Sequence, residues 1–421
     1  MNAFIGIFLI GLGVITGMTW LVRHKYGTIL NPYSLFVLYF ILHSLLPPIA
    51  WHYSGLQPVS DDIYLKAACL TTLHVFALGC CYLTSWSPLS GFLESIHKLF
   101  PVAERRVKFA RAITIANLVQ FGFVFLVLMV ASGAGLTWIT NSRQAYQYSR
   151  AGVGVFWSLA GATLLSGYLF YLSSKRPKGG KFAAMTLLFM FAAFFLGSKA
   201  LVVSFLLFGI FYYDNIVKRV SDILVVVSGV AGVCIGVGLM LIQGTASNIM
   251  QLAMYFDYFN NSAKFLATDA SKELQWGAVT LSNLWLFVPR ALYPDKPYSY
   301  GQNLITDMMC PGQVESAGFT PGLLTWSDFY WDFGIPGIIL LALITGMLSK
   351  AAFEMFRKKK SYASFIIFGQ IGFVYGIHVF MNAPFPLFLV WLLLQWAILG
   401  AVSKWMTITS EAGLCDGTEV G

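Results

Sequence analysis

"FIGIFLIGLGVITGMTWLV", residues 4–22, is an apolar run without a single charged side chain. A helix rises 1.5 Å per residue, so a run of this length reaches across the ~30 Å hydrocarbon core of a bilayer. No basic segment precedes the run, and no small-residue cleavage site follows it. The run therefore predicts a retained first membrane span and not a signal peptide.

The rest of the chain has the same character. Of its 421 residues, 57% are hydrophobic and 11% are charged, whereas soluble domains carry about a quarter charged residues. We therefore expect an all-α polytopic membrane protein with about 11 transmembrane helices, forming a single integral membrane domain over residues 1–421. The stretches long enough to span are 3–22, 33–52, 62–84, 112–131, 152–172, 182–196, 199–213, 222–242, 325–349, 362–381 and 386–405.

Charge placement predicts the orientation of these helices. If the basic clusters face the cytoplasm, eleven spans place the N-terminus outside and the C-terminus inside. The clusters are Arg23/Lys25, 104–111, 175–181, Lys218/Arg219 and 357–360. The net charge of +9 then orients helices, and we expect no nucleic-acid partner. Residues 243–324 become one large periplasmic loop, in which the aromatic segments 254–267 and 276–294 predict interfacial or re-entrant helices.

Several cations fall on the outer face, against the usual bias. Arg290 and Lys296 flank a turn stiffened by Pro289 and Pro297, while Arg143 and Arg150 are seven residues apart, on one face if helical. Lys199 begins a span in the sequence "GSK". Basic side chains at headgroup depth can bind a lipid phosphate, or they can simply reach for water.

The candidate proton acceptors are one histidine and two carboxylates. His378 lies near the outer end of a predicted span, where ionisable groups are functional candidates, although a histidine packed between helices is equally compatible. Asp328 and Asp332 are four apart and share a helix face, where they could act as base, hold sugar hydroxyls, or suit a helix N-terminus. No Cys/His metal spacing and no nucleotide-binding motif occurs, so we expect no metal and no cofactor.

Four features resemble the Wzy-type oligosaccharide repeat-unit polymerases, the O-antigen polymerase family. They are "NPYSLFVLYFILHSLLPP" (31–48), the "GSK" turn (197–199), "VPRALYPDKP" (288–297) followed by Gly301, and "TPGLLTWSDFYWDFGIPGIILLALITG" (320–346). The family commonly has Gly-Ser-Arg at the turn, so Lys199 departs from its pattern.

The resemblance implies a metal-independent, GT-C-like membrane-embedded glycosyltransferase of lipopolysaccharide biosynthesis. Its site would face the periplasm from the bacterial inner membrane. Donor and acceptor would be undecaprenyl-diphosphate-linked oligosaccharides, with undecaprenyl diphosphate leaving, and a chain-length regulator would be a further candidate partner. Arg143, Arg150, Arg290 and Lys296 would hold the diphosphate, with Lys199 as a supporting cation.

In the same reaction His378 would be the base, with Asp328 and Asp332 as second choices for that role or for holding sugars. The aromatic side chains of the loop would stack on sugars or anchor the loop at the interface. They are Trp276, Trp285, Tyr293 and Tyr298.

Two other functions use the same features. An O-antigen ligase would share the layout and the donor but pass the glycan to a lipid A core. A lipid-linked oligosaccharide flippase would need charges along many spans and internal symmetry, and the sequence shows few mid-span charges and no repeat.

Overall fold

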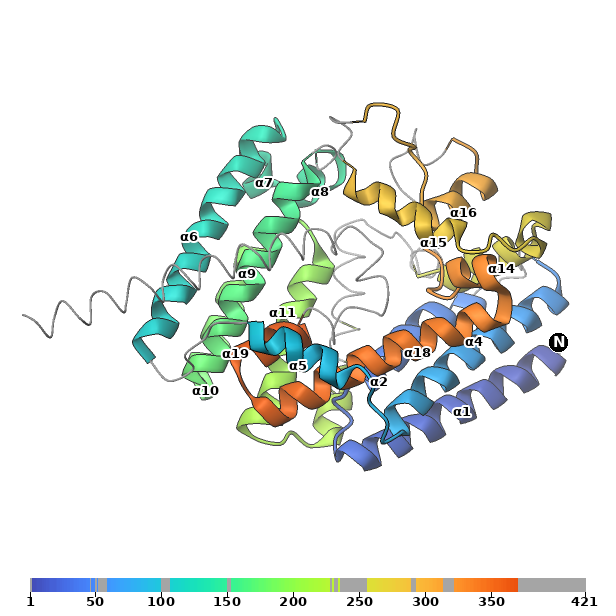
Figure 1. Ribbon diagram of the computed structural model, residues 1–421, viewed down its shortest axis with the longest axis horizontal. Helices are drawn as coiled ribbons and strands as arrows, with labels where there is room; N and C mark the ends of the chain where they lie inside the picture. The colour runs from blue at the N-terminus through green and yellow to red at the C-terminus, as the bar shows by residue number, and fades with distance from the viewer. Residues whose placement is uncertain are drawn as a thin grey trace, which may run out of the picture. The chain divides into compact units, whose positions relative to one another are not determined.

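The computed structural model describes most of the chain. The described residues are 2–45, 47–49, 51, 59–99, 107–149, 153–227, 229–230, 234, 256–288, 293–312 and 322–369. Every regular element among them is helical (Figure 1). The chain divides into two compact units, one built from 1–87, 220–350 and 375–382, and the other from 88–219, 351–374 and 383–421.

The first unit combines helices from the N-terminal part of the chain with a long helix from its C-terminal part. It contains α1 (Asn2–Tyr26), α2 (Pro32–Phe40), the π-helix η1 (Ile41–Leu45), α4 (Asp61–Leu83) and the part of α18 (Ser327–Lys359) up to Lys350. Helix α1 packs along α4. Gly346 lets α18 approach α4 closely, because a Cβ there would lie 2.8 Å from the Cβ of Cys81.

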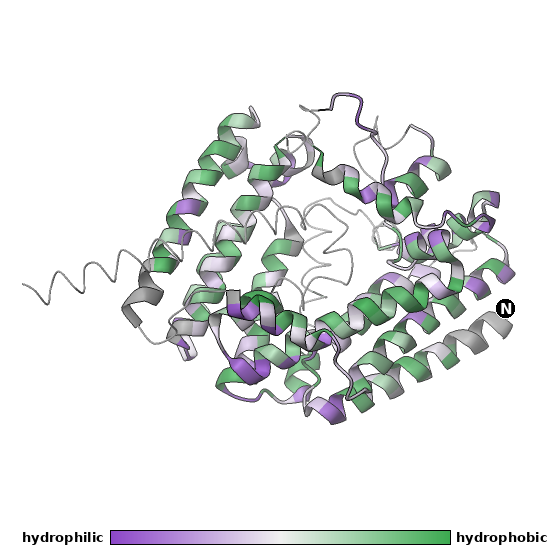
Figure 2. Cartoon of the chain, in the orientation of Figure 1, coloured by the Kyte–Doolittle hydropathy of each residue, from purple (hydrophilic) through white to green (hydrophobic). Residues whose placement is uncertain are grey.

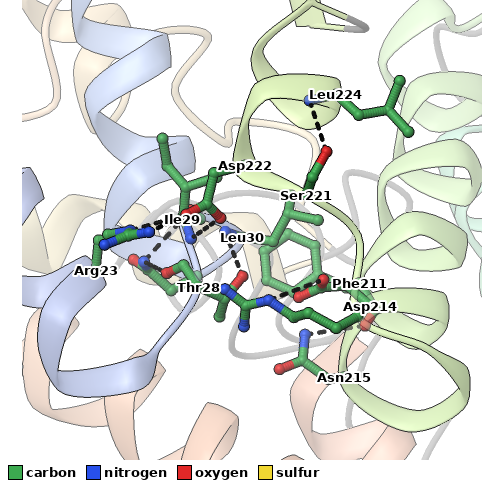
Figure 3. Close-up of polar contacts among 12 residues, drawn as sticks. Arg23, Thr28, Ile29, Leu30, Phe211, Asp214, Asn215, Ser221, Asp222 and Leu224 are labelled. Atoms are coloured by element: carbon green, nitrogen blue, oxygen red, sulfur yellow. Dashed lines mark hydrogen bonds and ion pairs between the residues drawn. The ribbon is translucent and has the colours of Figure 1, made fainter.

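Local signals set the ends of these helices. The Asn31 side chain accepts a hydrogen bond from the Ser34 backbone and Pro32 occupies the first turn of α2, the usual arrangement at a helix start. The connection from α1 to α2 is tied to Asp222, which accepts hydrogen bonds from the Arg23 side chain at 2.8 Å and the Ile29 backbone at 3.1 Å (Figure 3).

Two lysines cover the carboxyl end of α4. Lys350 Nζ donates to the carbonyls of Thr84 at 2.6 Å and Trp86 at 3.0 Å, and Lys25 Nζ donates to the carbonyls of Tyr82 at 2.7 Å and Thr84 at 2.8 Å. The carbonyls at a helix end lack helical partners and form the negative end of its dipole, so both cations stabilise this end.

The second unit is a separate group of helices. It contains α5 (Ser90–Leu99), α6 (Val107–Ala131), α7 (Thr137–Thr140), α8 (Ser142–Tyr148), α9 (Gly154–Lys175), α10 (Gly179–Phe194), α11 (Lys199–Tyr212), η2 (Tyr213–Val217), the end of α18 and α19 (Tyr362–Ile367). Helices α6 and α9 pack along each other, and α10 packs on α11. Two of the predicted spans, 182–196 and 199–213, correspond to α10 and α11, which are joined by a short turn.

Among the described residues, five helices are long and apolar enough to cross a membrane. They are Pro32–Ile49, Asp61–Leu83, Ile113–Ala131, Gly154–Ser173 and Ser327–Lys359. Large apolar side chains such as Phe123, 68% exposed, and Val130, 81% exposed, lie on their outer surfaces, and apolar residues dominate the helices (Figure 2). An exposed apolar surface of this kind suits lipid. The chain is thus a multi-span membrane protein, and the part of it that the structure describes is all-helical.

The count of eleven spans and the single domain stay predictions. Most of 222–242 and 362–381 and all of 386–405 lie outside the described residues. The segments predicted helical within 243–324 contain α14 (Tyr258–Ala267), α15 (Ala278–Ser282) and the 3₁₀-helix η4 (Asn283–Phe287). The same loop also holds η3 (Asp269–Lys272) and α16 (Gln302–Met309).

Candidate functional site

In the second unit, Arg143 lies against the turn that precedes Lys199. Its Nη1 donates to the Gly197 carbonyl at 3.4 Å, and the guanidinium lies 5.3 Å from the centre of the Tyr146 ring. One of its five N–H donors is used in this way, so the others can bind an anion. Because Ser198 accepts from Leu201 N and caps α11, Lys199 occupies the first turn of that helix; its side chain lies outside the described residues.

Gly197 makes this close approach possible. Its φ is +70°, and a Cβ at this position would lie 2.2 Å from the Ser142 carbonyl oxygen. No other residue type fits there without moving α8. The turn is also held by Trp157, whose Nε1 donates to the Leu196 carbonyl at 2.8 Å. The fold therefore places α8 and the start of α11 together, although they are more than fifty residues apart.

In the first unit, Asp332 binds the start of α15. Its Oδ1 accepts from the backbone N–H groups of Gly277 at 3.1 Å and Val279 at 3.0 Å, and its Oδ2 accepts from Thr280 N at 2.7 Å. The Asp332 side chain is fully buried. It acts as a helix cap supplied by a distant part of the chain.

Trp276 is held by the backbone of the same residue. Its backbone N–H donates to the Asp332 carbonyl at 3.0 Å, and its φ is +51°, unusual for a residue with a side chain. The ring is 76% exposed. The structure therefore brings Trp276 and Asp332 together and leaves the indole available to a sugar or to the lipid interface.

Asp328 differs from its neighbour on the same helix. It is 7% exposed, and its Oδ1 has no hydrogen-bond partner among the residues that the structure describes. The preceding Ser327 donates to Ser262 of α14 at 3.0 Å. A buried carboxyl oxygen without a partner is costly, and such groups are candidates for a substrate contact.

The turn around Lys296 closes back on η4. Lys296 Nζ donates to the Val288 carbonyl at 3.1 Å and lies 4.9 Å from the Tyr300 ring centre. Trp285 and Tyr293 stack with ring centres 5.4 Å apart. Tyr298 is 56% exposed. The loop thus holds one cation and several aromatic surfaces together in the first unit.

Three of the predicted site residues lie outside the described residues. These are His378, Arg290 and Arg150. The others fall into two groups, each within one unit: Arg143 beside the turn of Lys199, and Asp328, Asp332, Lys296 and the loop aromatics in the first unit. No group of three or more metal-ligating side chains occurs in the described ranges.

Sequence reasoning did not select a buried polar chain at the start of α14. Asp257 Oδ1 accepts from Asn260 Nδ2 at 2.5 Å, and Tyr64 of α4 donates to Asn260 Oδ1. Burial raises the pKa of Asp257 to about 6, against the lowering effect of its hydrogen bonds from Asn260. An aspartate directly before a helix, such as Asp257, is a local signal for a cap, but the contact to Tyr64 had no signal in the sequence.

His43 lies nearby in the π-helix η1. Its Nδ1 is 2.9 Å from the Tyr39 carbonyl oxygen, which can only accept, so Nδ1 carries the proton and Nε2 is left as the acceptor. The ring is stacked on Tyr39 at 4.1 Å and contacts Tyr258 at 4.3 Å. The π-helix is the structural feature that marks this histidine, since such turns are frequent at functional sites.

The chain is similar in sequence to two characterised proteins. It is 24% identical over 239 residues to the O-antigen polymerase of Salmonella typhimurium and, equally, to that of Salmonella typhi. The match covers 55% of this chain and 58% of each relative, so the chain spans less than two thirds of their length. No family model and no solved structure matches.

Proposed function

We propose that the protein is a membrane-embedded glycosyltransferase that polymerises lipid-linked oligosaccharide repeat units, as in O-antigen synthesis. The similarity to two O-antigen polymerases carries the proposal. The multi-span helical structure suits substrates that are held in the bilayer by a lipid. The packing of Arg143 on the turn of Lys199 supports a cationic site.

In the proposed reaction, undecaprenyl diphosphate leaves the anomeric carbon of the donor chain while a hydroxyl of the acceptor repeat unit attacks it. Negative charge grows on the departing diphosphate, so cations already in place there lower the barrier. We assign this role to Arg143, Arg150, Arg290 and Lys296, with Lys199 in support. The surroundings are of low dielectric, which strengthens each of these contacts.

The attacking hydroxyl must lose a proton. We assign its acceptance to His378, whose imidazole titrates near neutral pH. Of the second choices, Asp328 has an oxygen to offer, whereas both oxygens of Asp332 accept backbone hydrogen bonds. We therefore give Asp332 the task of positioning the loop that carries Trp276 and Trp285, and the aromatic side chains, including Tyr293 and Tyr298, the task of contacting sugars.

The proposed enzyme works without a metal ion, has a GT-C-like architecture and acts at the periplasmic face of the inner membrane. The large loop 243–324 lies on that face and a chain-length regulator is a candidate partner. Labelling of single cysteines from outside the cell tests this orientation: a cysteine in place of Tyr298 should react and one in place of Lys359 should not.

The purified protein in nanodiscs tests the reaction. Supplied only with repeat units on undecaprenyl diphosphate, a polymerase makes a ladder of chains. A ligase makes product only when a lipid A core is added, and a flippase moves the substrate between leaflets without joining it. Absence of the ladder with a pure, folded sample and the cognate repeat unit would reject the proposal.

Arginine variants test the cationic site. Arg143→Ala and Arg290→Ala should each remove most polymer while the protein remains in the membrane, and Arg143→Lys should retain part of it, because a point charge replaces the planar fork. Arg176→Ala, at the exposed end of α9, is the matched control. Chains of normal length from Arg290→Ala would exclude Arg290 from the site.

A further inference from the structure

Four consecutive cations, residues 357–360, lie at the end of α18 and just beyond it, and three of them line one cavity. The cavity is shallow and largely open to solvent, has a volume of about 330 Å³, and is lined by Asn215, Glu354, Arg357, Lys358 and Lys360. All five residues belong to the second unit. Lys359 is in the same run but does not line the cavity. The wall therefore carries three positive charges and one negative charge.

The fold holds Lys360 at this wall. Its φ is +51°, and its backbone N–H donates to the Phe356 carbonyl at 3.2 Å, which ends α18. The next residue, Ser361, is the first half of a capping box with Ser364 that starts α19, and its Oγ is 2.8 Å from Nε2 of His97. A side chain in the left-handed region needs such surroundings to hold it there.

Aromatic side chains pack beneath the turn. Phe356 packs on Phe368 with ring centres 4.6 Å apart and on Phe365 at 5.0 Å. The Arg357 guanidinium lies 5.6 Å from the centre of the Phe353 ring. The remaining lining residue, Asn215, lies in η2, and its Nδ2 donates to the Phe211 carbonyl at 3.0 Å (Figure 3). Packed aromatic residues thus support the turn that carries Lys360, while the cavity itself is lined by polar and charged side chains.

The place of the cavity at the end of a candidate span indicates which kind of ligand it binds. Ser327–Lys359 is a candidate span, so we expect the basic run at its end to lie close to the lipid headgroups. Orienting a span requires positive residues in the flanking loop, but it does not require that three of them share one cavity. Glu354 offsets one of the three positive charges, and a phosphate ester neutralises the net positive charge that remains through charge-assisted hydrogen bonds.

We propose that this cavity binds a phosphate monoanion, supplied by the headgroup of an anionic phospholipid. Arg357, Lys358 and Lys360 bind the phosphate oxygens, and Asn215 offers a neutral polar contact to the headgroup. The site is separate from the proposed diphosphate clamp and does not depend on the enzyme activity.

Native mass spectrometry of the full chain in detergent tests the proposal. The protein is titrated with phosphatidylglycerol, with phosphatidylcholine, and with glycerol phosphate as a soluble competitor. We expect one phosphatidylglycerol to bind at concentrations where phosphatidylcholine does not. Lys358→Gln and Lys360→Gln should each weaken it about fivefold, and Lys359→Gln should leave it unchanged.

Three results would overturn the proposal. Equal binding of the two lipids, or equal weakening by Lys358→Gln and Lys359→Gln, would show only a general attraction to the basic run. Full displacement of the lipid by glycerol phosphate at equal concentration would assign the cavity to a soluble phosphate. Lys358 and Lys360 are exposed side chains, so the variants should fold even if Arg357→Gln does not.

Discussion

Replacement of Asp332 by alanine should release the loop that contains α15. The carboxylate binds three backbone N–H groups, of Gly277, Val279 and Thr280, at 2.7–3.1 Å. Gly277 and Val279 are buried. Each buried N–H group that is left without a partner costs about 1–3 kcal/mol. Thr280 is half-buried and can turn to water at smaller cost.

The expected loss is therefore about 2–6 kcal/mol, concentrated in the loop. Each 1.4 kcal/mol is a factor of about ten in an equilibrium constant, so a loss of about 3 kcal/mol makes opening of the loop roughly a hundredfold more frequent. Asp332→Asn should lie between the wild type and alanine, because one oxygen remains to accept from Gly277 and Val279.

Limited proteolysis of the detergent-solubilised protein measures this opening. Under mild conditions the rate of cleavage follows the open population, so cleavage in 275–288 should rise in the order wild type, Asn, Ala. Asp269→Ala is the control, since this carboxylate pairs with Lys272 on the surface and caps no loop. Equal cleavage of Asp332→Ala and Asp269→Ala would refute the cap. Lost polymer with a fully protected loop would instead give Asp332 a direct role in the reaction.

Three further predictions concern other parts of the fold. Gly197→Ala should abolish most polymer formation and lower the melting temperature, because its Cβ would lie 2.2 Å from the Ser142 carbonyl and displace the turn beside Arg143; normal chain lengths in this variant would separate the turn from the reaction. Since the pKa of Asp257 is raised to about 6, its carboxyl ionises first in the unfolded state, so stability should fall as pH rises from about 4 to about 6, by up to ~3 kcal/mol. Melting temperatures over this range should show a smaller fall in Asp257→Asn, and equal slopes would contradict the raised pKa. Lys350→Met should cost about 1.5–3 kcal/mol, because the carbonyls of Thr84 and Trp86 lose a charged donor; a double variant with Lys25→Met should lose more than the two single losses combined, since each lysine can serve Thr84 alone.

The loop 243–324 shows which features of the fold could be predicted from the sequence. Its helical segments were predictable, because amphipathic aromatic runs and caps such as Asp257 are local signals. The attachment of the loop was not predictable, because the hydrogen bond that Gly277 donates to Asp332 joins residues 55 apart. Asp328 and Asp332 looked equivalent in the sequence, one helical turn apart, yet one caps a loop and the other keeps an oxygen without a described partner.

The sequence by itself determined that this is a helical membrane protein, because a spanning segment must satisfy its own backbone hydrogen bonds and cover itself with apolar side chains, and both requirements can be read from consecutive residues. It also located the cations and aromatic residues from which a site can be built. Only the tertiary structure decided that Arg143 lies on the turn before Lys199, that Lys25 and Lys350 cover one helix end, and that three of four adjacent cations share a cavity. Such contacts depend on how closely helices approach, and that distance is set by residues far apart in the chain, such as Gly197 and Gly346, which have no side chain to hold the helices apart.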